Sequence, residues 1–202
     1  MLGSSLILVA ALASAVLLFR RSEALAEAPQ SQLQVSSLSL VFIALAAMGQ
    51  LLLTPDNQDV ATLQRLLGNL ALYAGLPLLV TAVLALSMGW FWSKAGWGRW
   101  LLALFALFEL LRRMGLGESY TLWLSVALAA ALLVAAFKLP VLTGRIALAL
   151  AAPLILLGIS AGTLMTATPP ALLPPLAQAA GLGLISFALL QHTCKRQPEQ
   201  TG

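Results

Sequence analysis

The sequence predicts an all-α fold, a polytopic transmembrane helical bundle of seven spans with the N-terminus outside and the C-terminus in the cytoplasm. Of its 202 residues, 60% are hydrophobic and only 9% are charged, whereas a soluble domain carries about 25% charged residues. The apolar residues form runs close to the ~20 residues that a helix needs to cross the hydrocarbon of a bilayer. Lysine and arginine are also concentrated in alternate connections between these runs, which is typical of cytoplasmic loops.

The first three spans are expected at residues 2–19, 35–53 and 66–92. Arg20 and Arg21 follow the first run and nothing positive precedes it, whereas a signal peptide carries its positive charge before the apolar region. We therefore expect the first run to be a retained helix. A Thr-Pro pair ends the second run and the segment SKAGWGR ends the third, because proline, glycine and charge all disfavour a continuing membrane helix.

The last four spans are expected at residues 100–116, 120–137, 146–165 and 172–191. The segments GLGE, KLPVLTGR and TATPPALLPP separate them, and each contains glycine or proline. No loop has the length of a separate soluble domain. Residues 1–192 are therefore expected to form one transmembrane domain, and residues 193–202 a short polar cytoplasmic tail.

The distribution of basic residues supports seven spans with the N-terminus outside. In that topology eight basic residues are cytoplasmic: Arg20, Arg21, Lys94, Arg99, Lys138, Arg145, Lys195 and Arg196. Three are outside: Arg65, Arg112 and Arg113. If residues 100–116 lay on the membrane surface, the division would become six against five. Cytoplasmic segments of membrane proteins carry the excess of lysine and arginine, so the seven-span topology is favoured.

A weak internal repeat accompanies these spans. LALYAGL at 70–76 and LAQAAGL at 176–182 are identical at five of seven positions. The match is compatible with two parallel repeats of three helices, spans 1–3 and spans 5–7, joined by span 4, although sequences rich in leucine and alanine also give such matches by chance. The layout is similar to that of seven-helix sugar transporters, but the chain has none of their sequence motifs.

The third expected span carries the clearest polar pattern. Asn69, Tyr73, Pro77 and Thr81 recur at every fourth position, so they form a stripe that winds slowly around one side of the helix. Polar side chains that face lipid are costly, and the stripe is therefore expected to face the bundle interior. Pro77 is expected to kink the helix and to act as a hinge. The stripe is interpreted either as the wall of a solute pathway or as hydrogen-bonding contacts between helices.

Small residues at four-residue spacing predict close helix packing. Gly158 and Gly162 form a G-x-x-x-G pattern, and Gly75 and Gly181 each follow an alanine by four residues. Small side chains let membrane helices approach closely. We expect these four glycines to lie at contacts within the bundle.

The segment LFELLRRMG at 107–115 places charges inside an apolar run. Glu109 precedes Arg112 and Arg113 by three and four residues, so all three side chains share one side of a helix. A charge at the centre of a membrane helix costs about 2.5–3.5 kcal/mol. Two interpretations follow. Either the carboxylate is neutralised locally by the arginines, or Glu109 binds a proton, a cation or a polar solute and arginine balances its charge.

Catalytic sites are largely excluded by composition. The chain has one histidine and one cysteine, which rules out a bis-histidine haem and leaves too few ligands for a structural zinc site. We expect no metal, no cofactor and no catalytic residue, and a protein without enzymatic activity is favoured. Two functions remain open: a small-solute or ion transporter or channel, and a non-catalytic accessory or assembly subunit of a membrane complex. A membrane-embedded lipid-modifying enzyme is a third alternative.

The partners follow from the same features. The lipid bilayer is the expected surrounding of the chain, in a bacterial inner membrane, and other membrane subunits are candidate partners. Basic residues form no patch interleaved with aromatic residues outside the spans, so nucleic acid is not an expected partner.

Overall fold

Helices account for every regular element of the part of the chain that the structure describes. The computed structural model describes residues 2–23, 25, 27–54, 57–164 and 172–196, and for residues 27–28, 118, 161–164 and 194–196 it describes the backbone alone. The elements are α1 (Leu2–Ser22), α2 (Glu27–Leu52), α3 (Gln58–Leu70), the π-helical segment η1 (Ala71–Gly75), α4 (Leu76–Met88), α5 (Lys94–Arg113), α6 (Gly117–Lys138), α7 (Leu142–Leu164) and α8 (Leu173–Arg196).

Six of these helical segments are long and apolar enough to cross a membrane: α1, α2, the continuous α3–η1–α4, α6, α7 and α8. The predicted class, an integral membrane protein built as a helical bundle, is therefore confirmed. The expected span at 100–116 corresponds to α5, a 20-residue helix that carries five charged residues. Among the described residues α5 does not qualify as an apolar span by length and composition.

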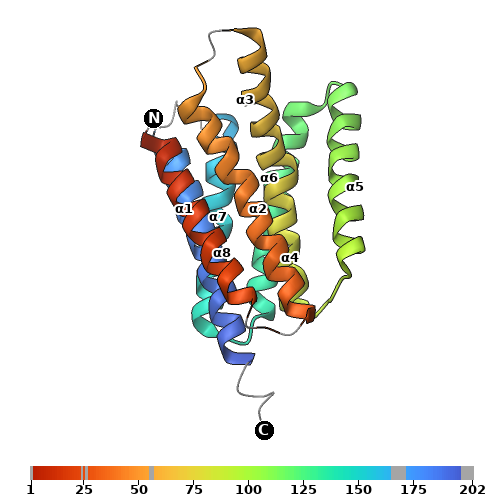
Figure 1. Cartoon of the computed structure of the whole chain (residues 1–202), viewed down its shortest axis with the longest axis vertical. Coiled ribbons are helices and arrows are strands. Elements are labelled where there is room, and N and C mark those ends of the chain that lie inside the picture. Colours follow the sequence, from red (N-terminus) through yellow and green to blue (C-terminus); the bar gives the residue numbers. More distant parts are fainter. Residues whose placement is uncertain (1, 24, 26, 55–56, 165–171, 197–202) are drawn as a thin grey trace.

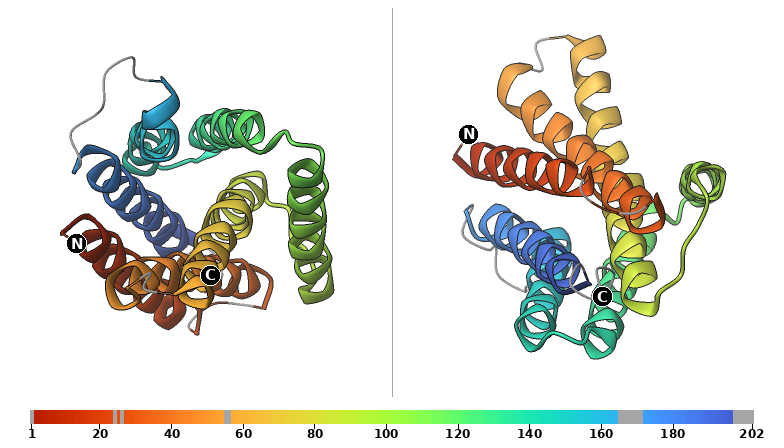
Figure 2. Two further views of the ribbon diagram at one scale, coloured as in Figure 1. Left: turned by 90° about the horizontal axis from the view of Figure 1, so that it is seen from above. Right: turned by 60° about the horizontal axis from the view of Figure 1, so that its bottom comes forward.

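The six apolar segments form a closed ring. Contacts connect α1 to α2, α2 to α4, α4 to α6, α6 to α7, α7 to α8, and α8 back to α1. Figure 2 shows this ring from above, with α5 standing outside it. In chain order, the ring consists of two halves of three consecutive helices, α1–α2–α4 and α6–α7–α8. The helix α5 connects the two halves.

The chain runs the height of the bundle seven times. As Figure 1 shows, α5 starts at the end of the bundle where α4 finishes and ends where α6 begins, so the N- and C-termini lie at opposite ends. The helix ends that carry the eight basic residues expected in the cytoplasm all lie at the end of the bundle that carries the C-terminus. The division of charge between the two ends is the division that the sequence suggested.

Leucine and alanine fill the interior of the ring. The largest fully buried side chains are Leu18, Leu33, Leu40, Ile43, Leu76, Leu78, Leu79, Leu86, Leu132, Leu148, Ile155 and Leu182. Most of them belong to one cluster that joins residues of all six ring segments, together with buried alanines. Small residues between the leucines let the helices approach closely, so the middle of the ring is a packed core.

Pro77 lies next to an irregular turn in the third ring segment. The segment Ala71–Gly75 is π-helical, and the backbone N–H of Leu76 donates to the carbonyl of Ala71, five residues earlier. Proline has no N–H to donate and its ring crowds the carbonyl four residues before it, which explains a widened turn directly before Pro77. A single π turn inside an α-helix is frequent at functional sites.

The boundaries of α4 and α5 differ from the expected spans because of local capping. Gly89 has φ of 71° and ends α4 at Met88, before the predicted residue 92, since glycine adopts the left-handed conformation without steric cost. Ser93 then caps α5, its Oγ accepting from the backbone N–H of Gly96 at 3.2 Å. The helix thus begins at Lys94 rather than near residue 100.

Candidate functional site

A vestibule opens at the end of the bundle that carries the N-terminus. It consists of two adjoining cavities of about 310 Å³ and 610 Å³. Both are lined by Ile7 of α1, Gln50 of α2, Gly158 of α7 and Gln178 of α8. The vestibule is therefore built by helices from both halves of the ring, together with the end of α3 and η1.

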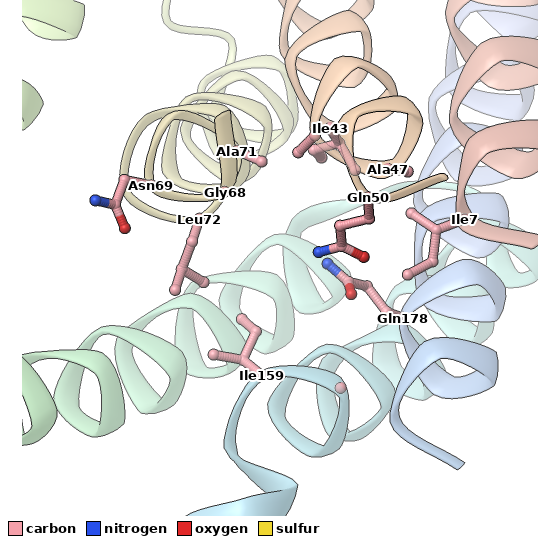
Figure 3. Close-up of a pocket in the computed structure, with 12 residues that line it drawn as sticks. Ile7, Ile43, Ala47, Gln50, Gly68, Asn69, Ala71, Leu72, Ile159 and Gln178 are labelled. Carbon is pink, nitrogen blue, oxygen red and sulfur yellow. The ribbon is translucent and has the colours of Figure 1, made fainter. Parts of the chain in front are cut away.

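Two glutamine side chains provide its main polar groups. Figure 3 shows the amides of Gln50 and Gln178 directed toward one another across the cavity, from α2 and α8. Ser4 of α1 donates from its Oγ to Oε1 of Gln50 at 3.0 Å. Each amide offers both N–H donors and a carbonyl acceptor, so the pair can hydrogen-bond a ligand that carries hydroxyl, carbonyl or amide groups.

The vestibule contains no ionisable side chain among the described residues that line it. The remaining lining residues are aliphatic, glycine or proline, apart from Ser4 and Asn69. An ion that entered this site would find no described lining side chain of opposite charge to balance it. The lining therefore suits a neutral polar ligand better than an ion.

The cavity is closed toward the middle of the bundle. Ile43 of α2 and Ala71 of η1 line its inner part and belong to the buried core cluster. Leu40 and Leu76, one turn further along the same two segments, are fully buried. Because the leucine core fills the ring at this depth, the vestibule is a dead end, and a solute cannot pass without a rearrangement of the helices.

Gly158 sets the position of Gln178. A Cβ atom at Gly158 would lie 2.9 Å from the Cβ of Gln178 and 3.1 Å from its backbone nitrogen, distances shorter than ordinary packing contacts. The absence of a side chain therefore allows α7 and α8 to approach at the level of the vestibule. The approach brings the Gln178 amide to the cavity wall.

Gly75 and Gly181 lie at comparable contacts in the two halves of the ring. A Cβ at Gly75 would be 3.2 Å from the backbone oxygen of Ser39 on α2, and one at Gly181 would be 2.9 Å from Ile155 of α7. Each glycine thus lies where the third helix of its half meets the second. Gly162 falls in the part of α7 for which only the backbone is described.

Glu109, Arg112 and Arg113 lie on α5, outside the ring. Arg112 donates from Nε and Nη2 to the two carboxylate oxygens of Glu109 at 2.9 Å, and Arg113 donates from Nε to Oε1 at 2.8 Å. The Glu109 side chain is 39% exposed and the arginines are 60% and 77% exposed. The carboxylate is paired within its own helix and does not line the vestibule.

Only one member of the polar stripe reaches the vestibule. Asn69 lines it, although Figure 3 shows its amide directed away from the two glutamines. The Tyr73 hydroxyl hydrogen-bonds Oγ1 of Thr121 on α6 at 2.7 Å. Oγ1 of Thr81 donates to the Pro77 carbonyl at 2.6 Å and accepts from Trp100 Nε1 of α5 at 3.3 Å. The stripe beyond Asn69 therefore faces α5 and α6 rather than the ring interior.

Aromatic side chains attach α5 to the ring at two levels. The Tyr73 ring stacks on Phe108 of α5 with centroids 4.1 Å apart, and on Tyr120 of α6 at 5.5 Å. Nearer the start of α5, Trp97 belongs to a buried cluster with side chains of α4, and Trp92 packs against it with centroids 4.9 Å apart. Stacked aromatic pairs stabilise beyond their buried area. Tyr73 is thus part of the attachment of α5.

The structure does not bring the sequence-predicted site residues together. In the transporter interpretation Glu109 and Tyr73 would line one central pathway. Instead, Glu109 is ion-paired on the surface of α5, and Tyr73 stacks on Phe108. The two glutamines of the vestibule were not among the expected site residues. The signal that could have found them is a neutral amide within an apolar helix, because an unsatisfied polar group in hydrocarbon is costly. Gln178 lies within the repeated segment LAQAAGL.

Other polar groups of the ring pair internally. Ser125 of α6 and Ser160 of α7, both buried, are hydrogen-bonded at 2.5 Å, a contact typical of interhelical packing. Within the described part of the chain, no three histidine, cysteine, aspartate or glutamate residues are placed to hold a metal ion. Comparison of the chain with protein-family models, with curated proteins and with solved structures finds no match.

Proposed function

We propose that this chain is a small transporter that receives a neutral polar solute in the vestibule. The N-terminal end faces the outside, the basic end faces the cytoplasm of a bacterial-type inner membrane, and α5 completes seven crossings. The observation that carries the proposal is the pair of facing amides, Gln50 and Gln178, in a cavity lined without charge. The two amides together offer several N–H donors and carbonyl acceptors at the cavity wall, which favours a hydrogen-bonding ligand.

The shape of the site supports transport by alternating access. The vestibule is open at one end and closed by the core at the other, as expected for a transporter in an outward-open state. Its wall combines helices of both halves of the ring, and in repeat-built transporters the substrate site lies between the repeats. The π-helical turn of η1 lines the vestibule through Ala71 and Leu72 and offers a local point of bending next to Pro77.

Transport of radiolabelled solutes into proteoliposomes tests the proposal. Urea, glycerol and glucose serve as neutral probes, and glutamate and lysine as charged ones. We expect transport of at least one neutral probe and of neither charged probe. Gln50→Leu and Gln178→Leu should each lower that transport about tenfold, because a lost hydrogen bond costs about 1–1.5 kcal/mol.

Two variants outside the vestibule are matched controls. Gln58→Leu removes an exposed amide in the first turn of α3, and Glu109→Gln removes the carboxylate of α5. Both should transport as the unmodified protein does. A folded, reconstituted protein that moves none of the neutral probes would contradict the proposal and favour an accessory or assembly subunit. Unchanged transport by Gln50→Leu and Gln178→Leu would show that the vestibule is not the solute site.

A further inference from the structure

A separate groove lies between α5 and the ring, toward the end of the molecule that carries the C-terminus. It has a volume of about 280 Å³ and is formed by the first half of α2, by α4 and by the first half of α5. It shares no lining residue with the vestibule. Whatever occupies it is therefore recognised independently of the proposed transport site.

The greater part of the groove is apolar and open. Val35 and Leu38 of α2, Leu78 of α4 and Leu101 of α5 line it. The Leu38 side chain is 44% exposed. A Cβ atom placed at Gly98 would meet no other atom within 4 Å, so the groove is unfilled beside α5. Such an elongated hydrocarbon surface matches a flexible aliphatic chain.

The groove ends in a cation and a buried donor. Lys94, the first residue of α5, is exposed and is the charged residue that lines the groove. Trp97 is 3% exposed, and its indole Nε1 is buried with no hydrogen-bond partner in the structure. Buried N–H groups are nearly always hydrogen-bonded. That nitrogen has almost no accessible surface, so an acceptor in the groove does not reach it.

We propose that the groove binds one acyl chain of an anionic phospholipid, with the phosphate at Lys94. The apolar walls hold the chain, and the ammonium balances the phosphate charge. The groove lies at the basic end of the bundle. Anionic lipids attract such basic segments at the cytoplasmic leaflet.

Native mass spectrometry of the full-length protein tests this proposal. The delipidated protein is titrated in detergent with dioleoyl phosphatidylglycerol and, separately, with dioleoyl phosphatidylcholine. We expect one phosphatidylglycerol to be retained with about fivefold preference over phosphatidylcholine. The choline ammonium already balances the phosphate of phosphatidylcholine, whereas one basic side chain attracts an anionic lipid by about 1 kcal/mol. Lys94→Gln should abolish the preference.

A variant whose larger side chain fills the groove tests directly whether the lipid binds there. Gly98→Leu places a side chain in its open part, and Gly183→Leu places the same side chain on the exposed face of α8, where a Cβ also meets no atom within 4 Å. We expect Gly98→Leu to lose the bound lipid and Gly183→Leu to keep it. Leu38→Phe fills the groove from α2 and gives the same readout should Gly98→Leu fail to fold.

Three results would overturn the proposal. They are equal retention of phosphatidylglycerol in Gly98→Leu and Gly183→Leu, equal binding of phosphatidylglycerol and phosphatidylcholine, and displacement of the lipid by millimolar inorganic phosphate. The last result would mean that Lys94 binds a free phosphate and that the apolar groove contributes nothing. The transport assay is independent, because the variants tested there lie in the vestibule.

Discussion

Small residues are as important as polar residues for the arrangement of the vestibule. Gln50 and Gln178 supply the hydrogen-bonding groups, but Gly158 allows the backbone carrying Gln178 to approach α7. Glu109, by contrast, is satisfied without a contribution from another helix. Its charge is costly within an apolar run, yet the two arginines of its own helix satisfy it. The charge of Glu109 is therefore explained by neighbours on its own helix, whereas the amides of Gln50 and Gln178 meet because distant helices pack together.

Gly158→Ala is predicted to destabilise the bundle. The added Cβ would lie 2.9 Å from the Cβ of Gln178 and 3.1 Å from its backbone nitrogen, so α8 must shift. Overpacking of this kind costs about 1–3 kcal/mol. Thermal unfolding in detergent should show a lower Tm than that of the unmodified protein. Gly183→Ala is the control, because the added Cβ meets no atom within 4 Å. It should leave the Tm unchanged.

Among the elements, α5 stands apart from the other helices. It runs the height of the bundle beside the ring (Figure 1) but carries charge at both ends. An aromatic contact holds it to η1 near its end, and tryptophans pack around its start. Because α5 runs from the end of the bundle where α4 finishes to the end where α6 begins, the two halves of the ring follow the same direction along the bundle.

The crossing of α5 can be tested by labelling single cysteines. Cys194 is the one cysteine of the chain, so Cys194→Ser gives a cysteine-free background. Ala95→Cys and Met114→Cys lie at exposed positions at the two ends of α5. An impermeant maleimide added outside intact cells should label Met114→Cys and leave Ala95→Cys unlabelled until the cells are opened. Labelling of both positions from the same side would show that α5 lies on the membrane surface.

For the whole molecule, the closed ring of two halves is the feature that links fold and proposed function. The halves meet along α4 and α6 on one side and along α1 and α8 on the other. The second of these junctions borders the vestibule, where Gly3 and Pro175 both line the wall. A movement of one half against the other would open or close the vestibule at this junction.

A disulfide across this junction is predicted to stop transport. A Cβ at Gly3 would lie 2.8 Å from the Cβ of Pro175, so Gly3→Cys and Pro175→Cys in the Cys194→Ser background can form a bond once the helices relax slightly. Oxidation should produce an intramolecular cross-link and lower solute uptake, and a reductant should restore it. Each single cysteine variant is the control. Full uptake by the cross-linked protein would argue against movement of the halves at α1 and α8.

The sequence by itself determined the class of the protein and the ends of most helices. Lengths of apolar runs and positions of proline, glycine and charge are local properties, so most helix ends lie within about five residues of the predicted spans. The helices α2 and α3 are exceptions, because each begins eight residues before the predicted span. The capping by Gly89 and Ser93 shifted α4 and α5. The gathering of eight basic residues at one end also followed from the sequence, because it depends only on the alternating direction of successive helices.

Only the tertiary structure decided which side chains meet. The stripe of the third span is visible in the sequence, but the rotation of that helix about its axis turns Tyr73 toward Phe108 and Thr121. Gln50 and Gln178 come together because α2 and α8 lie on either side of α1 in the closed ring (Figure 2). Neighbour relations and helix rotation result from packing between distant segments, and no local pattern in the sequence specifies them.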